Sequence, residues 1–128
     1  MVEGRFAELI AGQRQGVLVT LRKDGRPQLS NVNYAWYPEE QTIRVSTTDD
    51  RAKTGNMRRD PRVTIEVYAQ DDPYQYVTVT GIAELEESDE ANCHIDKLSE
   101  KYTGNPKFQS HRPNERRVIV RVKPERVS

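Results

Sequence analysis

The chain has 128 residues, which is enough for one domain but too few for two domains that each bury an independent core. Its 20 lysine and arginine residues balance 20 aspartate and glutamate residues, so the formal net charge is zero, and the net basic footprint of a nucleic-acid-binding protein is missing. Hydrophobic residues make up only 34% of the chain, and no apolar run is long enough to span a membrane.

The single cysteine, Cys93, excludes an intramolecular disulfide and is typical of a reducing compartment. The first residues contain no apolar segment of the signal-peptide kind. We therefore expect a cytoplasmic protein. The low share of apolar residues also favours burial of further surface between subunits, so we expect a homodimer.

The first half of the chain predicts a short helix followed by three antiparallel strands. The expected elements are a helix over 3–12 and strands over 16–21, 28–34 and 42–47. Asp24-Gly25 joins the first two strands, because both residues tolerate positive φ and are typical of a hairpin. Pro38 opens the next turn. Three strands connected in this way form a meander.

The second half predicts a helical insertion and then more strands. The expected elements are a helix over 51–59, strands over 62–68, 74–85 and 118–122, and a further helix that begins at Ser88. Asp49 or Asp50 is the expected N-cap of the helix over 51–59, and Asp60-Pro61 is expected to end it. Six or so antiparallel strands interrupted by helices predict a mainly β protein, a closed or split barrel forming a single domain over 1–128.

Two cations in the first turn of the helix over 51–59 give the clearest indication of a binding site. Arg51 and Lys53 lie where the helix dipole is positive, so each would cost about 0.3–1 kcal/mol when exposed. A bound phosphate would remove this cost, since backbone N–H groups, the dipole and both cations would converge on it, with Ser46 as a further donor. The alternative is that Asp49 and Asp50 pair with these cations on a solvated face.

Polar and aromatic side chains on two of the strands offer further candidates. Gln28, Ser30 and Asn31 carry amide and hydroxyl groups, which can either hydrogen-bond the edge of a flavin-like ring or simply face solvent. Tyr74 and Tyr76 lie two residues apart and therefore share one face of their strand. They can cover a planar ring or form part of a dimer interface.

Other reactive residue types do not form a recognisable centre. His94, His111 and Cys93 are not spaced as metal ligands, so we expect no metal. The chain has no G-x-S-x-G nucleophile motif. No residue stands out as a proton donor, and the catalytic residues stay unassigned.

Three segments together match a known pattern of residues. They are Gly16-Val17-Leu18-Val19-Thr20-Leu21 with the hairpin and strand up to Val32, Arg51-Ala52-Lys53-Thr54 with the segment up to Arg62, and Arg116-Arg117-Val118-Ile119 with the segment up to Val127. The first resembles the opening of the pyridoxine 5′-phosphate oxidase-like split β-barrel proteins, an FMN-binding type of fold. The other two are similar to the actinobacterial branch of that family, which uses the deazaflavin coenzyme F420 and includes biliverdin-reducing members.

The resemblance implies a homodimer with two cofactor sites at the subunit interface. It implies that Ser46, Arg51 and Lys53 hold the cofactor phosphate, that Gln28, Ser30 and Asn31 lie near the ring and linker, that Asn56 adds a helix contact, and that the partner subunit contributes the region of Tyr76. The expected activity is transfer of a hydride from reduced F420 to a conjugated small molecule such as an enone, a quinone or a tetrapyrrole. The alternatives are an FMN-dependent oxidase or reductase, and a non-catalytic flavin or deazaflavin binding or storage protein.

Overall fold

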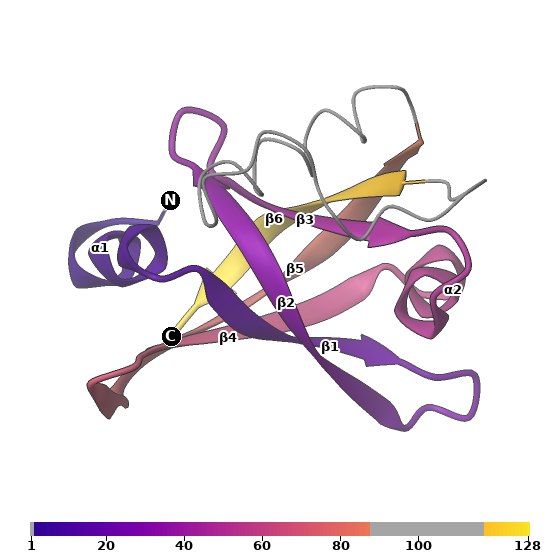
Figure 1. Ribbon diagram of the computed structural model, residues 1–128, viewed down its shortest axis with the longest axis horizontal. Helices are drawn as coiled ribbons and strands as arrows, with labels where there is room; N and C mark the ends of the chain where they lie inside the picture. The colour runs from indigo at the N-terminus through magenta and orange to yellow at the C-terminus, as the bar shows by residue number, and fades with distance from the viewer. Residues whose placement is uncertain (1, 88–116) are drawn as a thin grey trace.

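The computed structural model describes residues 2–87 and 117–128 (Figure 1). The described elements are α1 (Gly4–Gly12), β1 (Gln15–Leu21), β2 (Pro27–Tyr37), β3 (Thr42–Thr48), α2 (Ala52–Arg59), β4 (Arg62–Ala69), β5 (Asp72–Glu87) and β6 (Arg117–Val127). The strands form a closed antiparallel barrel in the order β1-β2-β3-β6-β5-β4. The predicted fold class, a mainly β barrel with helices, is confirmed.

The core lies inside the barrel, because alternate residues of each strand point inward. In β4, Val63, Ile65 and Val67 are buried, whereas Arg62 and Glu66 face out. Inward positions of the other strands follow the same rule: Leu18 of β1, Val45 of β3, Val77 and Val79 of β5, and Val120 and Val122 of β6 are all fully buried. The strict alternation expected over 62–68 is therefore confirmed.

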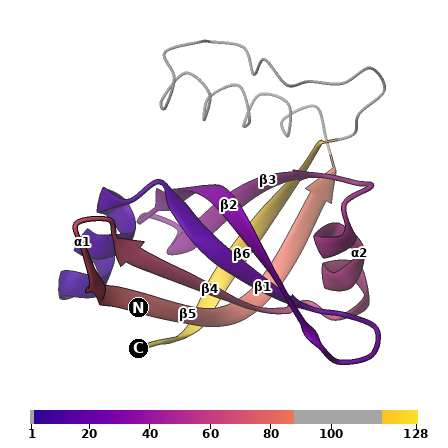
Figure 2. The same ribbon diagram turned by 60° about the horizontal axis from the view of Figure 1, so that its bottom comes forward.

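The two helices lie at opposite ends of the barrel (Figures 1 and 2). Ile10 of α1 is fully buried, and its carbonyl accepts a hydrogen bond from the Tyr34 hydroxyl of β2. At the other end, α2 buries Met57 and contacts β1 and β2 through Asn56. The two ends of the barrel are thus chemically distinct, one next to α1 and the other next to α2.

Two glycines explain local features of the sheet. Gly25 has a φ of +87°, as the predicted hairpin between β1 and β2 requires, and β2 begins at Pro27. Gly81 sits where the register between β5 and β6 shifts. A Cβ at Gly81 would lie 2.1 Å from the carbonyl oxygen of Lys123, so only glycine allows β6 to approach β5 this closely.

Several predicted boundaries need correction. β5 begins at Asp72, before the predicted start at 74, and runs to Glu87, and β6 extends to Val127 rather than ending at 122. The predicted helix beginning at Ser88, together with Cys93, His94 and His111, lies outside the described residues. Within residues 2–87 and 117–128, no helix is long and apolar enough to cross a membrane, and no group of three or more His, Cys, Asp or Glu side chains is placed to hold a metal.

Candidate functional site

The first turn of α2 carries two cations beside a helix end that no side chain caps. Arg51 is the N-cap residue, with extended backbone and no side-chain cap hydrogen bond, and the first turn contains no acidic residue. Lys53 is half-buried, and both burial and the nearby Arg51 charge lower the pKa of its ammonium group. An anion at this point would stabilise both cations and the backbone N–H groups of the first turn.

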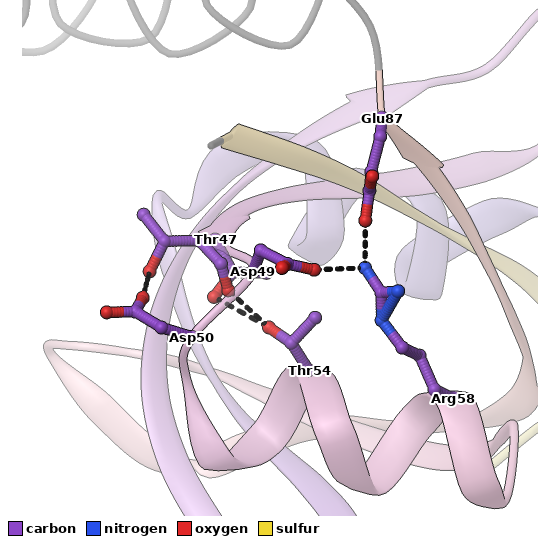
Figure 3. A network of polar contacts seen from close by, with 7 residues as sticks. Thr47, Asp49, Asp50, Thr54, Arg58 and Glu87 are labelled. Carbon is purple, nitrogen blue, oxygen red and sulfur yellow. Dashed lines mark hydrogen bonds and ion pairs between the residues drawn. The ribbon is translucent and has the colours of Figure 1, made fainter. Parts of the chain in front are cut away.

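The neighbouring acids are engaged elsewhere, which corrects the predicted N-cap (Figure 3). Asp49 Oδ1 accepts a hydrogen bond of 2.5 Å from Arg58 Nη2, at the far end of α2. Asp50 Oδ1 accepts one of 2.7 Å from the Thr48 hydroxyl. Across the part of the chain that the structure describes, no carboxylate forms an ion pair with Arg51 or Lys53, so the alternative in which Asp49 and Asp50 neutralise these cations is wrong.

Buried threonines attach the start of α2 to the end of β3. The Thr54 hydroxyl donates a hydrogen bond of 2.7 Å to the carbonyl of Thr48, and the Thr47 hydroxyl lies 3.4 Å from that of Thr54 (Figure 3). The Arg51 N–H donates to the same Thr48 carbonyl. These bonds, made in a buried setting, hold Arg51 and Lys53 in a defined position relative to β3.

Ser46, the site residue predicted on the adjoining strand, has a buried hydroxyl with no hydrogen-bond partner. It lies on the face of β3 opposite to that of Thr47, because successive strand residues alternate. A buried polar atom without a partner costs about 1–3 kcal/mol and is uncommon in folded proteins. Among the described residues, no hydrogen bond joins Ser46 to Arg51 or Lys53, and Thr47, on the other face of β3, is the residue that contacts Thr54 of α2.

Asn56 connects α2 to the β1–β2 hairpin. Its Nδ2 donates hydrogen bonds to Gln28 Oε1 at 3.0 Å and to Thr20 Oγ1 at 3.1 Å, while its Oδ1 accepts one of 3.0 Å from Arg59. The side chain of Gln28 is thereby oriented by α2. Two of the predicted site residues, Gln28 and Asn56, are in direct contact.

The remaining predicted residues lie farther from α2. Ser30 is half-buried and Asn31 is exposed, both on β2. Tyr76 is exposed on β5 opposite Tyr68 of β4. The β4–β5 hairpin beside this pair lies near the α1 end of the barrel in Figure 1, so one chain does not bring Tyr76 to the cations of α2.

A cavity of about 640 Å³, not foreseen from the sequence, opens at the α1 end. It is lined by the segment that connects α1 to β1, by the middle of β2 and by the end of β4 with the turn that follows. The only signal in the sequence is the polar run Gln13-Arg14-Gln15 directly before a β-prone segment. Asn31 belongs to this lining, which places one predicted site residue at the cavity.

Comparison with known proteins agrees with this architecture. A family model described as pyridoxamine 5′-phosphate oxidase matches residues 2–128. The chain is 30% identical over 114 residues to the F420H(2)-dependent biliverdin reductase of Mycobacterium tuberculosis (strain CDC 1551 / Oshkosh), covering 87% of this chain and 75% of the relative.

Solved structures are similar to the chain over the same barrel. A structure named F420 Reductase is 29% identical and superposes with a TM-score of 0.84, covering 99% of this chain and 98% of the other. The conserved hypothetical protein Rv2991 from Mycobacterium tuberculosis is 32% identical with a TM-score of 0.78, covering 99% of this chain and 82% of that one. The match extends over nearly the whole barrel in both cases.

Proposed function

Because the chain belongs to the pyridoxamine 5′-phosphate oxidase family, we propose that it is an F420-dependent oxidoreductase. The observation that carries the proposal is the pair of cations at the start of α2, Arg51 and Lys53, which no described carboxylate neutralises. Two similar proteins, one named F420H(2)-dependent biliverdin reductase and the other F420 Reductase, support the choice of cofactor.

The residues at this end of the barrel fit a cofactor that carries a phosphate. Arg51 and Lys53 would hold the phosphate, and Ser46 would give its unpartnered buried hydroxyl as a further donor. FMN carries a phosphate too, so the charge of the site suits either cofactor. The deazaflavin is preferred because the chain is similar over most of its length to an F420H(2)-dependent biliverdin reductase and to an F420 Reductase.

The protein's own residues bind and orient, while the cofactor supplies the chemistry. Bound in its reduced form, the deazaflavin supplies a hydride to a conjugated acceptor such as an enone, a quinone or a tetrapyrrole. Gln28, held in place by Asn56, would contact the ring and linker with Ser30 and Asn31. No residue is assigned as proton donor, and we assign the proton that the acceptor takes up to solvent water.

We further propose a homodimer with the two cofactor sites at the subunit interface, acting in the cytoplasm. Large apolar side chains on the outside of the barrel support an interface: Tyr74 is 89% exposed, Leu29 64% and Tyr76 52%. In the dimer, Tyr76 of one subunit would cover the cofactor bound to the other. Sedimentation at micromolar concentration tests this, and a species of only 14.8 kDa would exclude a shared site.

Titration with the two cofactors, followed by anaerobic turnover, tests the proposed activity. Purified protein is titrated with F420 and with FMN, then mixed with reduced cofactor and biliverdin, a quinone or an enone. We expect tighter binding of F420 and protein-dependent reoxidation of its reduced form. Turnover with reduced FMN alone would favour the FMN-dependent alternative. Tight F420 binding without turnover of any acceptor would favour the storage protein.

A further inference from the structure

A chain of hydrogen bonds runs from the C-terminal end of α2 to the β1–β2 hairpin, where it ends on Gln28. Resting on the proposed function, we propose that this chain fixes the direction of the Gln28 amide, so that Gln28 donates an N–H to an oxygen atom of the cofactor. Asn56 is then a positioning residue behind Gln28 and does not contact the cofactor itself, in contrast to the helix contact that the resemblance implies.

Arg59 begins the chain and fixes the orientation of the Asn56 amide. A guanidinium has N–H donors and no acceptor. Arg59 Nη2 donates to Asn56 Oδ1 at 3.0 Å and to the Leu21 carbonyl at 3.2 Å, so the guanidinium is held by both α2 and β1. Rotation of the Asn56 amide by half a turn would set its N–H groups against those of Arg59. The oxygen of Asn56 therefore faces Arg59, and its nitrogen faces the hairpin.

Asn56 uses both of its N–H groups within the protein. Its Nδ2 donates to Thr20 Oγ1 at 3.1 Å and to Gln28 Oε1 at 3.0 Å. Asn56 is only 7% exposed, and Thr20 is fully buried. An amide with both N–H groups engaged has no donor left for a ligand. Since its oxygen is turned to Arg59, the Asn56 side chain can influence the cofactor only through Gln28.

Gln28 ends the chain with one polar group free. Its Oε1 accepts from Asn56, whereas its Nε2 has no hydrogen-bond partner among the described residues and is not one of the buried polar atoms that lack one. Lys53 and Asn56 share one face of α2, so Gln28 lies on the side of the helix that carries Lys53. Flavins and deazaflavins have carbonyl oxygens, phosphate oxygens and a ring N–H. Gln28, with its amide fixed, is matched to the oxygens.

Nuclear magnetic resonance of isotope-labelled protein tests the donor role directly. Without cofactor, the side-chain N–H groups of Asn56 should exchange slowly with water and those of Gln28 rapidly. Saturating F420 should slow exchange at Gln28 by about tenfold, as one hydrogen bond implies, and leave Asn56 unchanged. The spectrum of Gln28→Met identifies the Gln28 resonances by their absence. Unchanged exchange at Gln28 in the saturated protein would overturn the proposal.

A double-mutant cycle separates positioning by Asn56 from direct contact. Gln28→Met and Asn56→Leu should each weaken F420 binding by roughly two- to tenfold, as loss of one neutral hydrogen bond implies. The double variant should lose no more than Gln28→Met alone, because Asn56 acts through Gln28. Losses that multiply would overturn the positioning role. The control Asn33→Leu, at an exposed position of β2, should bind F420 as the original does.

Two further probes identify the oxygen and separate this inference from the proposed function. A loss by Gln28→Met that persists for the deazaflavin nucleoside without a phosphate assigns the contact to the ring or linker, and a loss that disappears assigns it to the phosphate. If FMN binds in place of F420 and slows exchange at Gln28, the choice of F420 fails and the donor role of Gln28 stands. If neither cofactor binds, both fail.

Discussion

The two ends of α2 carry the same kind of side chain in opposite circumstances. At the C-terminal end, Arg58 pairs with Asp49, and Arg59 donates to Asn56, where the helix dipole also favours positive charge. At the N-terminal end, Arg51 and Lys53 face the positive end of the dipole without a carboxylate partner among the described residues. The cations at the C-terminal end therefore stabilise the fold, whereas those at the N-terminal end destabilise it. This difference is expected when the N-terminal cations bind an anionic ligand.

Among the variants that test this comparison, Lys53→Ala should have the largest effect on cofactor binding. It removes a charge-assisted contact worth about 1.5–3 kcal/mol, so cofactor binding should weaken roughly ten- to a hundredfold. The cofactor-free protein should keep its Tm or gain slightly, because an unfavourable interaction with the dipole is lost. Calorimetry measures the affinity for the cofactor, and thermal unfolding measures the stability of the cofactor-free protein. Arg58→Ala is the matched control and should bind the cofactor as the original does; equal losses in both variants would contradict the contrast.

Ser46→Ala should weaken cofactor binding by up to about tenfold. The cofactor-free protein should be as stable as before or more stable, because the substitution removes a buried hydroxyl without a partner. The comparison is Thr54→Val, whose hydroxyl donates to the Thr48 carbonyl and whose loss should cost about 1 kcal/mol of unfolding free energy. Denaturant unfolding measures both. A destabilised Ser46→Ala with unchanged affinity would show that Ser46 is structural.

The dependence of cofactor binding on pH in the alkaline range tests the role of Lys53. The pKa of the Lys53 ammonium lies below the ordinary 10.5, so the group loses its proton at a lower pH than usual. The affinity for the cofactor should therefore fall about threefold or more as the pH approaches 10.5. Without ligand the sign reverses: stability rises with pH between the lowered pKa and 10.5, because the unfolded chain binds more protons there. Lys53→Arg should abolish the pH dependence of the affinity. Its persistence would assign the titration to another group.

Arg58→Ala should have the smallest effect, and only on stability. Arg58 pairs with Asp49 and Glu87 at half-exposed positions, so the loss should be about 0.2–1 kcal/mol for each pair and should shrink at high salt. Unfolding at low and high ionic strength measures it. A salt-independent loss of several kcal/mol would mean that Arg58 does more than pair on the surface.

Local patterns predicted the parts of the fold that depend on neighbours in sequence. The alternation over 62–68 and the Asp24-Gly25 pair identified β4 and the first hairpin, because each depends only on local backbone preference. The N-cap of α2 was wrong because Asp49 pairs with Arg58 nine positions later, a choice made by tertiary packing. The end of β6 was underestimated because Lys123 and Pro124 break the apolar pattern while still pairing with β5.

The candidate site likewise has residues that the sequence predicts and others that only the fold brings together. Arg51 and Lys53 stand out in the sequence because two cations at a helix start contradict a general electrostatic rule. The cavity could not be foreseen, since its lining comes from three separate segments that only the closed barrel brings together. The hydrogen bond between Asn56 of α2 and Gln28 of β2 joins positions 28 residues apart and is equally a product of the fold.

The position of β6 between β3 and β5 has a consequence for the order of folding. Neighbours in sequence make up β1-β2-β3 and β4-β5, so these units can form early, whereas β6 must pair Val122 with Ile43 of β3 and Val120 with Leu85 of β5. Contacts between such distant positions carry a high loop-closure entropy and slow the search. Until β6 docks, β3 and β5 are unpaired edges, which is the interval in which aggregation would compete with closure of the barrel.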